Sequence, residues 1–191
     1  LMASDSTRSA PAESSVMKPC LVVIDIQNEY LKYIPERDKF LAMEMINALI
    51  LFFRANDYPI IRVYNTHPEW GPAPDSESFE FPESVSIVPT DPKIIKNYPS
   101  AFRKTDLHAI LQQKDRNTLF LCGLSAVGCV LATYFDALNY EYDVFMVRDA
   151  LMSHKSEYTN FVEAAFSTVN GTSLQVMLKY AEKSKKGNTD D

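Results

Sequence analysis

Three side chains in this sequence could together build an activated nucleophile: the carboxyl group of Asp25, the amine of Lys96 and the thiol of Cys129. A thiol attacks a carbonyl carbon as its thiolate, which forms with the help of a nearby base, a nearby cation or a helix N-terminus that lowers its pKa. In this trio the carboxyl group would accept the thiol proton, and the ammonium group would stabilise the negative sulfur. The trio therefore predicts covalent catalysis by a cysteine, although each residue alone would also suit an ordinary structural role.

Expected strands explain how positions so far apart in the sequence could meet. Asp25 ends an apolar run, Lys96 ends a short strand, and Cys129 follows a third strand and the turn 123–128 at the start of a helix. In a parallel sheet, ligands bind beyond the carboxyl ends of the strands. We therefore expect the three side chains to gather at one edge of such a sheet.

Strands and helices alternate along the whole body of the chain. The expected strands cover 20–25, 58–64, 93–96, 118–122, 143–147 and 166–169. The expected helices cover 35–56, 106–113, 127–138, 156–164 and 174–181. This alternation predicts an α/β fold with a largely parallel sheet.

Three local features add detail to this expectation. Apolar residues recur at helical spacing within 35–56 and predict one buried stripe, made of Phe40, Met43, Ile46, Ile50 and Phe53. Residues 171–173 are expected to cap the last helix. The irregular stretch 65–91 is longer than most connections, and loops of that length are often functional.

The composition is that of an ordinary globular protein: 191 residues, 46% of them hydrophobic, with a net charge of −6. We expect one domain over 17–181, between an extension over 1–16 (disordered, or left from cloning) and a polar tail over 182–191. The acidic balance argues against nucleic acid as a partner, and no apolar run is long enough to span a membrane. Three cysteines without a Cys-x-x-Cys pair indicate a reducing compartment. We expect the cytoplasm, with organellar targeting left open.

Three blocks of sequence together resemble the isochorismatase-like cysteine hydrolases. The blocks are Leu-Val-Val-Ile-Asp-Ile-Gln-Asn-Glu-Tyr over 21–30, the Ser-Ala-Phe and Thr-x-Leu motifs within 95–107, and Gly-Leu-Ser-Ala-Val-Gly-Cys-Val-Leu-Ala-Thr over 123–133. They occur in that family's order. The resemblance implies a three-layer sandwich, with a six-stranded parallel sheet and helices on both faces. It also implies that Cys129 attacks a carbonyl carbon, that Asp25 manages the protons and that Lys96 supports both charges.

The same resemblance implies further site residues. The family usually has a cis peptide bond before its nucleophile, which falls here between Leu124 and Ser125. The backbone N–H groups of Ser125 and Cys129 would then point at the developing oxyanion. The substrate pocket is expected to include Gln27, His67, Trp70 and Phe102.

The sequence departs from the family pattern at the place where some members bind a metal. Nicotinamidases of the family hold zinc through Asp-x-His and a second histidine shortly after. The corresponding residues here are Asn65 and His67, and no second histidine follows before His108. Asparagine is a poor zinc ligand, although Glu69 could stand in. We expect no metal and no other cofactor. A second departure is Ala126, where many relatives have threonine, and it could change the polarity of the pocket.

Several alternatives stay open at this stage. Lys104 is a rival to Lys96 because it lies in the same segment, although Lys96 ends a strand. The leading function is hydrolysis of a small amide-like C–N bond through an acyl-enzyme. The others are vinyl ether hydrolysis of the isochorismatase type, which does not need the cysteine, and a non-catalytic oligomeric role. We expect a small-molecule substrate and a homo-oligomer (dimer or tetramer), because the loop 65–91 carries apolar residues that sit poorly in water, namely Trp70, Phe79 and Phe81.

Overall fold

A computed structural model describes residues 16–69 and 71–181. The expected extension over 1–16 lies outside the described residues except for Val16, and so does the expected tail over 182–191.

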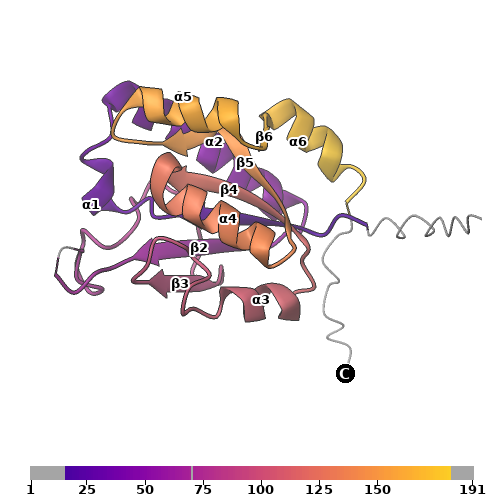
Figure 1. Cartoon of the computed structure of the whole chain (residues 1–191), viewed down its shortest axis with the longest axis horizontal. Coiled ribbons are helices and arrows are strands. Elements are labelled where there is room, and N and C mark those ends of the chain that lie inside the picture. The colour runs from indigo at the N-terminus through magenta and orange to yellow at the C-terminus, as the bar shows by residue number, and fades with distance from the viewer. Residues whose placement is uncertain (1–15, 70, 182–191) are drawn as a thin grey trace, which may run out of the picture.

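The core of the fold is a single six-stranded sheet (Figure 1). Its strands are β1 (Pro19–Ile24), β2 (Ile60–Asn65), β3 (Lys93–Lys96), β4 (Thr118–Leu124), β5 (Asp143–Met152) and β6 (Thr168–Val169). They are arranged in the order β3-β2-β1-β4-β5-β6, and every neighbouring pair is parallel. Parallel neighbours need crossover connections, which the helices supply. The expected six-stranded parallel sheet is confirmed.

Helices cover both faces of this sheet. They are α1 (Asn28–Leu31), α2 (Glu36–Ala55), α3 (Leu107–Gln113), the one-turn π-helix η1 (Ala126–Val130), α4 (Leu131–Asn139), α5 (Ser156–Ala165) and α6 (Gly171–Leu178). Alternate residues of β1 point to opposite sides: Leu21 and Val23 join the core beneath α2 and α6, whereas Val22 and Ile24 join the core beneath α3 and α4. The result is the expected three-layer sandwich, with α4 in front of the strands in Figure 1. Among the described residues, no helix is long and apolar enough to cross a membrane.

The buried stripe of α2 differs from the one expected. Its buried residues are Ala42, Ile46, Leu49, Ile50 and Phe53. Phe40 is 65% exposed, because it is out of phase with this stripe at 100° per residue. Met43 is only partly buried, at the border of the core.

The long loop after β2 packs its described aromatic residues into the core. The rings of Phe79 and Phe81 stack on Tyr64, with centroid separations of 5.1 Å and 4.2 Å, and all three residues are buried. The expectation that these phenylalanines sit at a subunit interface is therefore wrong, because the end of β2 already covers them. Trp70, the third aromatic residue on which the expected interface rested, lies outside the described residues.

The C-terminal elements begin and end differently from expectation. Asn170 caps α6, because its side chain accepts the N–H of Ser173, so the cap lies one residue before the expected 171–173. Strand β6 has only two residues, and β5 runs on to Met152 past an irregularity in its pairing with β4. This longer β5 brings Ser153 to the same edge of the sheet as Asp25 and Lys96.

Candidate active site

Buried polar residues gather where the strands end. Asp25 directly follows β1, Asn65 and Lys96 are the last residues of β2 and β3, and Ser153 directly follows β5. All four are buried. Buried polar groups need partners, so this cluster has to be satisfied internally. The sheet therefore assembles at its carboxyl edge the kind of site that open α/β sheets usually carry there.

Lys96 joins the acid and the thiol. Its Nζ lies 2.7 Å from Asp25 Oδ2 and 3.3 Å from Cys129 Sγ. The side chains of Lys96 and Asp25 are 0% and 2% exposed, so the ion pair is shielded from water. The rival Lys104 is exposed, and its Nζ lies 5.3 Å from the ring centroid of Tyr98. The structure thus brings Lys96, and not Lys104, into contact with Asp25 and Cys129.

The thiol of Cys129 rests in its protonated form. Burial, and secondly the charge of Asp25, raise its pKa to about 12, although Lys96 opposes both effects. The net pKa is high because removal from water outweighs the favourable contact with the ammonium group. A thiol in this state would have to give its proton to a neighbouring base before it could act as a nucleophile.

Asp25 carries the carboxyl group beside this thiol. Burial raises the pKa of its carboxyl group, whereas the ammonium of Lys96 and the thiol of Cys129 lower it. Its second oxygen, Oδ1, is buried and accepts no hydrogen bond from the described residues. The backbone of Asp25 has a φ of 54°, a conformation that costs energy in a residue other than glycine and is often found at functional sites.

The turn before Cys129 leaves one N–H group without an acceptor. The peptide bond between Leu124 and Ser125 is cis. The carbonyl of Ser125 accepts the N–H groups of Gly128 and Val130, at 2.9 Å and 3.2 Å. The N–H of Ser125 itself donates to no group in the described part of the chain. An unpaired N–H beside a thiol is the type of donor that could bind an oxyanion.

Gly123 allows β4 to run this close to β1. Its φ is 115°, and a Cβ atom at this position would lie 2.0 Å from the carbonyl oxygen of Ile24. Only glycine fits both the conformation and the contact. The turn that carries Cys129 can therefore sit beside Asp25.

Thr133 ties the lysine segment to the helix that begins near Cys129. Its Oγ1 donates to the carbonyl of Cys129 at 2.7 Å and accepts the N–H of Ala101 at 3.0 Å. No role was predicted for Thr133, although a threonine four residues after the cysteine can reach its carbonyl on a helix. Ser153 was likewise not predicted to lie near the site, and its Oγ is 3.3 Å from that of Ser125.

Comparison with known proteins identifies the family. Residues 19–177 match the isochorismatase domain. The chain belongs to the isochorismatase family. An isochorismatase family protein of Bacillus subtilis, YddQ, is 31% identical over 144 residues, which are 70% of this chain and 77% of that protein.

Solved structures of isochorismatase family proteins share the fold. One from Burkholderia thailandensis has a TM-score of 0.76 at 21% identity, covering 86% of this chain and 100% of its own. The N-carbamoylsarcosine amidase of Thermoplasma acidophilum has a TM-score of 0.69 at 26% identity, covering 81% of this chain and 95% of its own.

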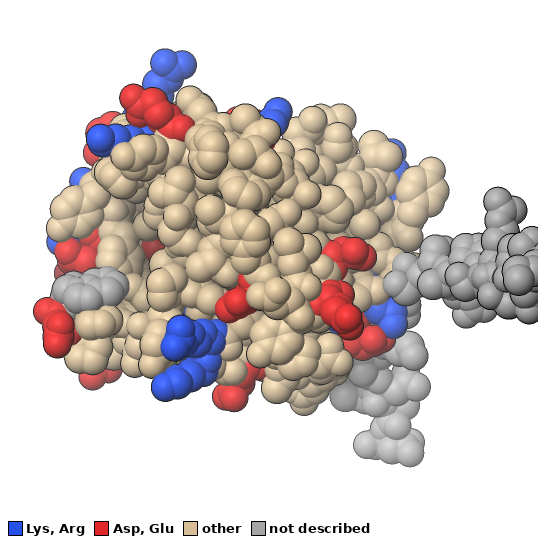
Figure 2. All heavy atoms as spheres, in the orientation of Figure 1, with Lys and Arg blue, Asp and Glu red and all other residues tan. Residues whose placement is uncertain are grey.

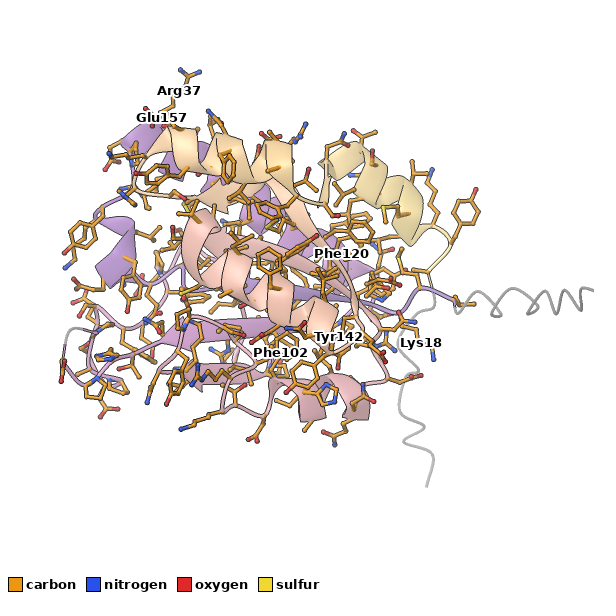
Figure 3. The ribbon with its side chains drawn as sticks, in the orientation of Figure 1. Lys18, Arg37, Phe102, Phe120, Tyr142 and Glu157 are labelled. Carbon is orange, nitrogen blue, oxygen red and sulfur yellow. The ribbon has the colours of Figure 1, made fainter. Side chains whose placement is uncertain are left out.

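Two residues expected in the substrate pocket of this isochorismatase family member have other tasks. Gln27 is fully buried, and both polar atoms of its side chain bond to the main chain of Asn65. Phe102 is also buried, and its ring stacks on Tyr140 and Tyr142 at the far end of α4 (Figure 3). A place for either residue in the substrate pocket stays a prediction.

The other two expected pocket residues lie in the loop after β2. His67 is half-buried, and its Nδ1 accepts the N–H of Glu69. Trp70 lies outside the described residues. A place for either residue in the pocket stays a prediction.

The residues of the zinc-binding members' metal site do not fit a metal here. Asn65 Oδ1 accepts from Lys96 Nζ at 3.2 Å, and Asn65 Nδ2 donates to the hydroxyl of Tyr30 at 2.8 Å. Within 16–69 and 71–181, no three His, Cys, Asp or Glu side chains are grouped to hold an ion. The nearest cation is the ammonium of Lys96, which would repel a second positive charge.

We therefore predict that the purified protein holds well under one metal ion per chain and keeps its activity in chelators. Elemental analysis and an assay with and without a chelator test this. Stoichiometric zinc whose binding is lost in His67→Ala would contradict the prediction.

Proposed function

We propose that this isochorismatase family hydrolase cleaves a small amide-like C–N bond through a covalent acyl-enzyme on Cys129. The observation that carries the proposal is the contact of one buried ammonium, on Lys96, with both the carboxylate of Asp25 and the sulfur of Cys129. A similar fold in an amidase, the N-carbamoylsarcosine amidase described above, supports the same class of substrate.

In the proposed first half-reaction, Asp25 Oδ1 takes the thiol proton while the sulfur attacks the carbonyl carbon. The new S–C bond pushes the carbonyl electron pair onto oxygen, and the N–H groups of Ser125 and Cys129 bind the resulting oxyanion. When the carbonyl reforms, the C–N bond breaks and the leaving nitrogen takes the proton from Asp25. A thioester remains on Cys129.

In the second half-reaction, Asp25 activates a water molecule, which attacks the thioester. The thiolate leaves and recovers a proton from Asp25, and the acid product departs. The Lys96 ammonium stays in place throughout and offsets whichever neighbour is negative, first the carboxylate and then the thiolate. Because burial raises the pKa of Asp25, this carboxylate is a stronger base than an ordinary aspartate.

Vinyl ether hydrolysis is the second candidate. It needs an acid but no nucleophile, so an isochorismatase of that type would use Asp25 and leave the sulfur idle. The contact between Lys96 and Cys129 favours the amide reaction, and it also argues against a purely non-catalytic role.

Ammonia release tests the proposed function. Wild-type protein is incubated with a panel of small primary amides and ureido compounds, before and after alkylation of Cys129 with iodoacetamide. We expect at least one compound to release ammonia, and alkylation to abolish the release. Hydrolysis of isochorismate by the alkylated protein, without ammonia release from any compound, would contradict the proposal.

We also propose a cytoplasmic homo-oligomer. Unpaired Cys20, Cys122 and Cys129 suit a reducing compartment. Exposed apolar side chains lie on α4 and α5, including Phe135 and the 60% exposed Phe161. Figure 2 shows few charges over the face that carries α4, so this face is a better interface than the loop after β2.

Light scattering at micromolar concentration should give a mass at least twice that of the 21.7 kDa chain. The physical reason is that burying this apolar face against a second copy removes it from water. Phe161→Lys should lower the mass, and exposed Tyr33→Lys, on another surface, should leave it unchanged. A wild-type mass that stays near 21.7 kDa at every concentration would contradict the oligomer.

A further inference from the structure

The ammonium group of Lys96 has three protons, and the structure supplies three acceptors for them. Asp25 Oδ2 lies at 2.7 Å, Asn65 Oδ1 at 3.2 Å and Cys129 Sγ at 3.3 Å. The Lys96 side chain is 0% exposed, so solvent does not replace any of these partners. An ammonium group can only donate. Asn65 is the one acceptor of the three that the proposed reaction does not consume or transform.

The amide of Asn65 can bind Lys96 in only one orientation. Its oxygen must face the ammonium group, which leaves its NH₂ group to face the hydroxyl of Tyr30, at 2.8 Å. Tyr30 lies in α1 and is half-buried, so its ring comes from a separate element and is held in place. The hydroxyl of Tyr30 donates its own proton toward the main-chain carbonyl of Asn65, 3.5 Å away, so it can accept the NH₂ group and hold the amide in this orientation.

The main chain of Asn65 is held as firmly as its side chain. Gln27 accepts the N–H of Asn65 at 2.7 Å and donates to its carbonyl at 3.0 Å. Asn65 is also the residue of β2 that pairs with Lys96 of β3 in the register of the sheet. The main chain from which the amide of Asn65 extends is therefore fixed beside Lys96.

We propose that Asn65 is a positioning residue, oriented by Tyr30, that holds the Lys96 ammonium between Asp25 and Cys129. This inference rests on the proposed function and adds a residue to its machinery. A neutral amide suits the task because it accepts a proton contact without adding charge. Once Asp25 has taken the thiol proton, the thiolate is then the only anion that Lys96 faces. A carboxylate at this position would compete with the sulfur for the ammonium group.

The first test observes the ammonium group directly, without a substrate. A ¹H–¹⁵N spectrum of lysine Nζ groups in the full chain should show a Lys96 signal that is protected from exchange. Asn65→Leu keeps the side-chain volume but removes the acceptor, so exchange should be about tenfold faster or the signal lost. Tyr30→Phe should give a smaller effect in the same direction. Asn139→Leu, on α4 outside the site, is the matched control and should leave the signal unchanged.

The second test measures the alkylation rate of Cys129 by iodoacetamide at fixed pH. Asn65→Leu should react about tenfold more slowly, because a less restrained ammonium group stabilises the thiolate less. Alkylation of Asn65→Asp should also be slower. Its new carboxylate keeps an acceptor beside Lys96 but competes with the sulfur for the ammonium group. If Asn65→Leu fails to fold, Tyr30→Phe and Asn65→Asp carry both tests.

The outcomes separate this inference from the proposed function. A folded Asn65→Leu protein with wild-type Lys96 exchange and wild-type alkylation would show that Asn65 is only structural, and a wild-type protein without a protected Lys96 signal would also overturn the inference. A wild-type protein that shows the protected signal but releases no ammonia from any amide would overturn the proposed function and leave the role of Asn65 standing.

Discussion

Cys129→Ser should lower kcat/KM for the substrate by at least about 10³-fold, because removal of a nucleophile is among the most damaging changes an enzyme can suffer. A serine hydroxyl is far harder to ionise than a thiol, and Asp25 is too weak a base to compensate. The measurement is ammonia release from the best compound of the amide panel, compared for equal amounts of folded protein.

Two controls accompany the serine variant. Cys20→Ala removes a cysteine at the start of β1, away from the carboxyl edge of the sheet, and should keep the activity. Iodoacetamide should label Cys129 ahead of Cys20 and Cys122, because those two thiols are fully buried whereas Cys129 is only partly buried. Full activity in Cys129→Ser, or labelling of Cys122 first, would contradict the assignment of Cys129 as the nucleophile.

Asp25→Asn should lower kcat by about 10²- to 10⁴-fold, the usual contribution of a general base. The substitution keeps the shape of the side chain but removes the group that accepts the thiol proton. It should also destabilise the fold by about 3 kcal/mol, because it leaves the buried Lys96 without its counter-ion. Urea unfolding and ammonia release measure the two effects separately.

A double variant distinguishes catalysis from stability at Asp25. Asp25→Asn combined with Lys96→Met removes both charges, so it should recover much of the lost stability but none of the activity. If the double variant regained activity along with stability, Asp25 would have only a structural role.

The pH profile gives a third measurement on Asp25. The proposed reaction needs the carboxylate, and burial raises the pKa of this carboxyl group above its ordinary value of 3.8. Activity should therefore be lost as the pH falls through that raised pKa, at a higher pH than for an exposed aspartate. In Asp25→Asn the acid limb should disappear from the residual activity.

Much of the fold could be predicted from sequence, since alternating strands and helices allow few topologies. The parallel arrangement then brings strand ends together, which is why Asp25, Lys96 and Cys129 could be grouped although they lie far apart in the chain. The boundaries of the strands and helices could be predicted less well than their order. The length of β5 depends on an irregular pairing with β4, and no residue type in the sequence signals it.

The details of the site were harder to predict because they depend on the directions in which the side chains point. Phe102 follows the lysine segment, but its ring turns toward Tyr140 and Tyr142, which come from a distant part of the chain. Asn65 was visible in the sequence only as a missing zinc ligand, and its contacts depend on where the Lys96 side chain ends. The high pKa of Cys129 follows from burial, which a single sequence does not reveal.

The strand that carries Lys96 has a consequence for thermal inactivation. Strand β3 has four residues, lies at the edge of the sheet and pairs only with β2, whereas β1 and β4, which lead to Asp25 and Cys129, lie in its centre. Short edge strands open at a lower free energy than central strands. On warming, the enzyme should therefore lose the ammonium group from its site while the rest of the sheet is still intact. We therefore expect activity to be lost by detachment of this one edge strand, at a lower temperature than global melting.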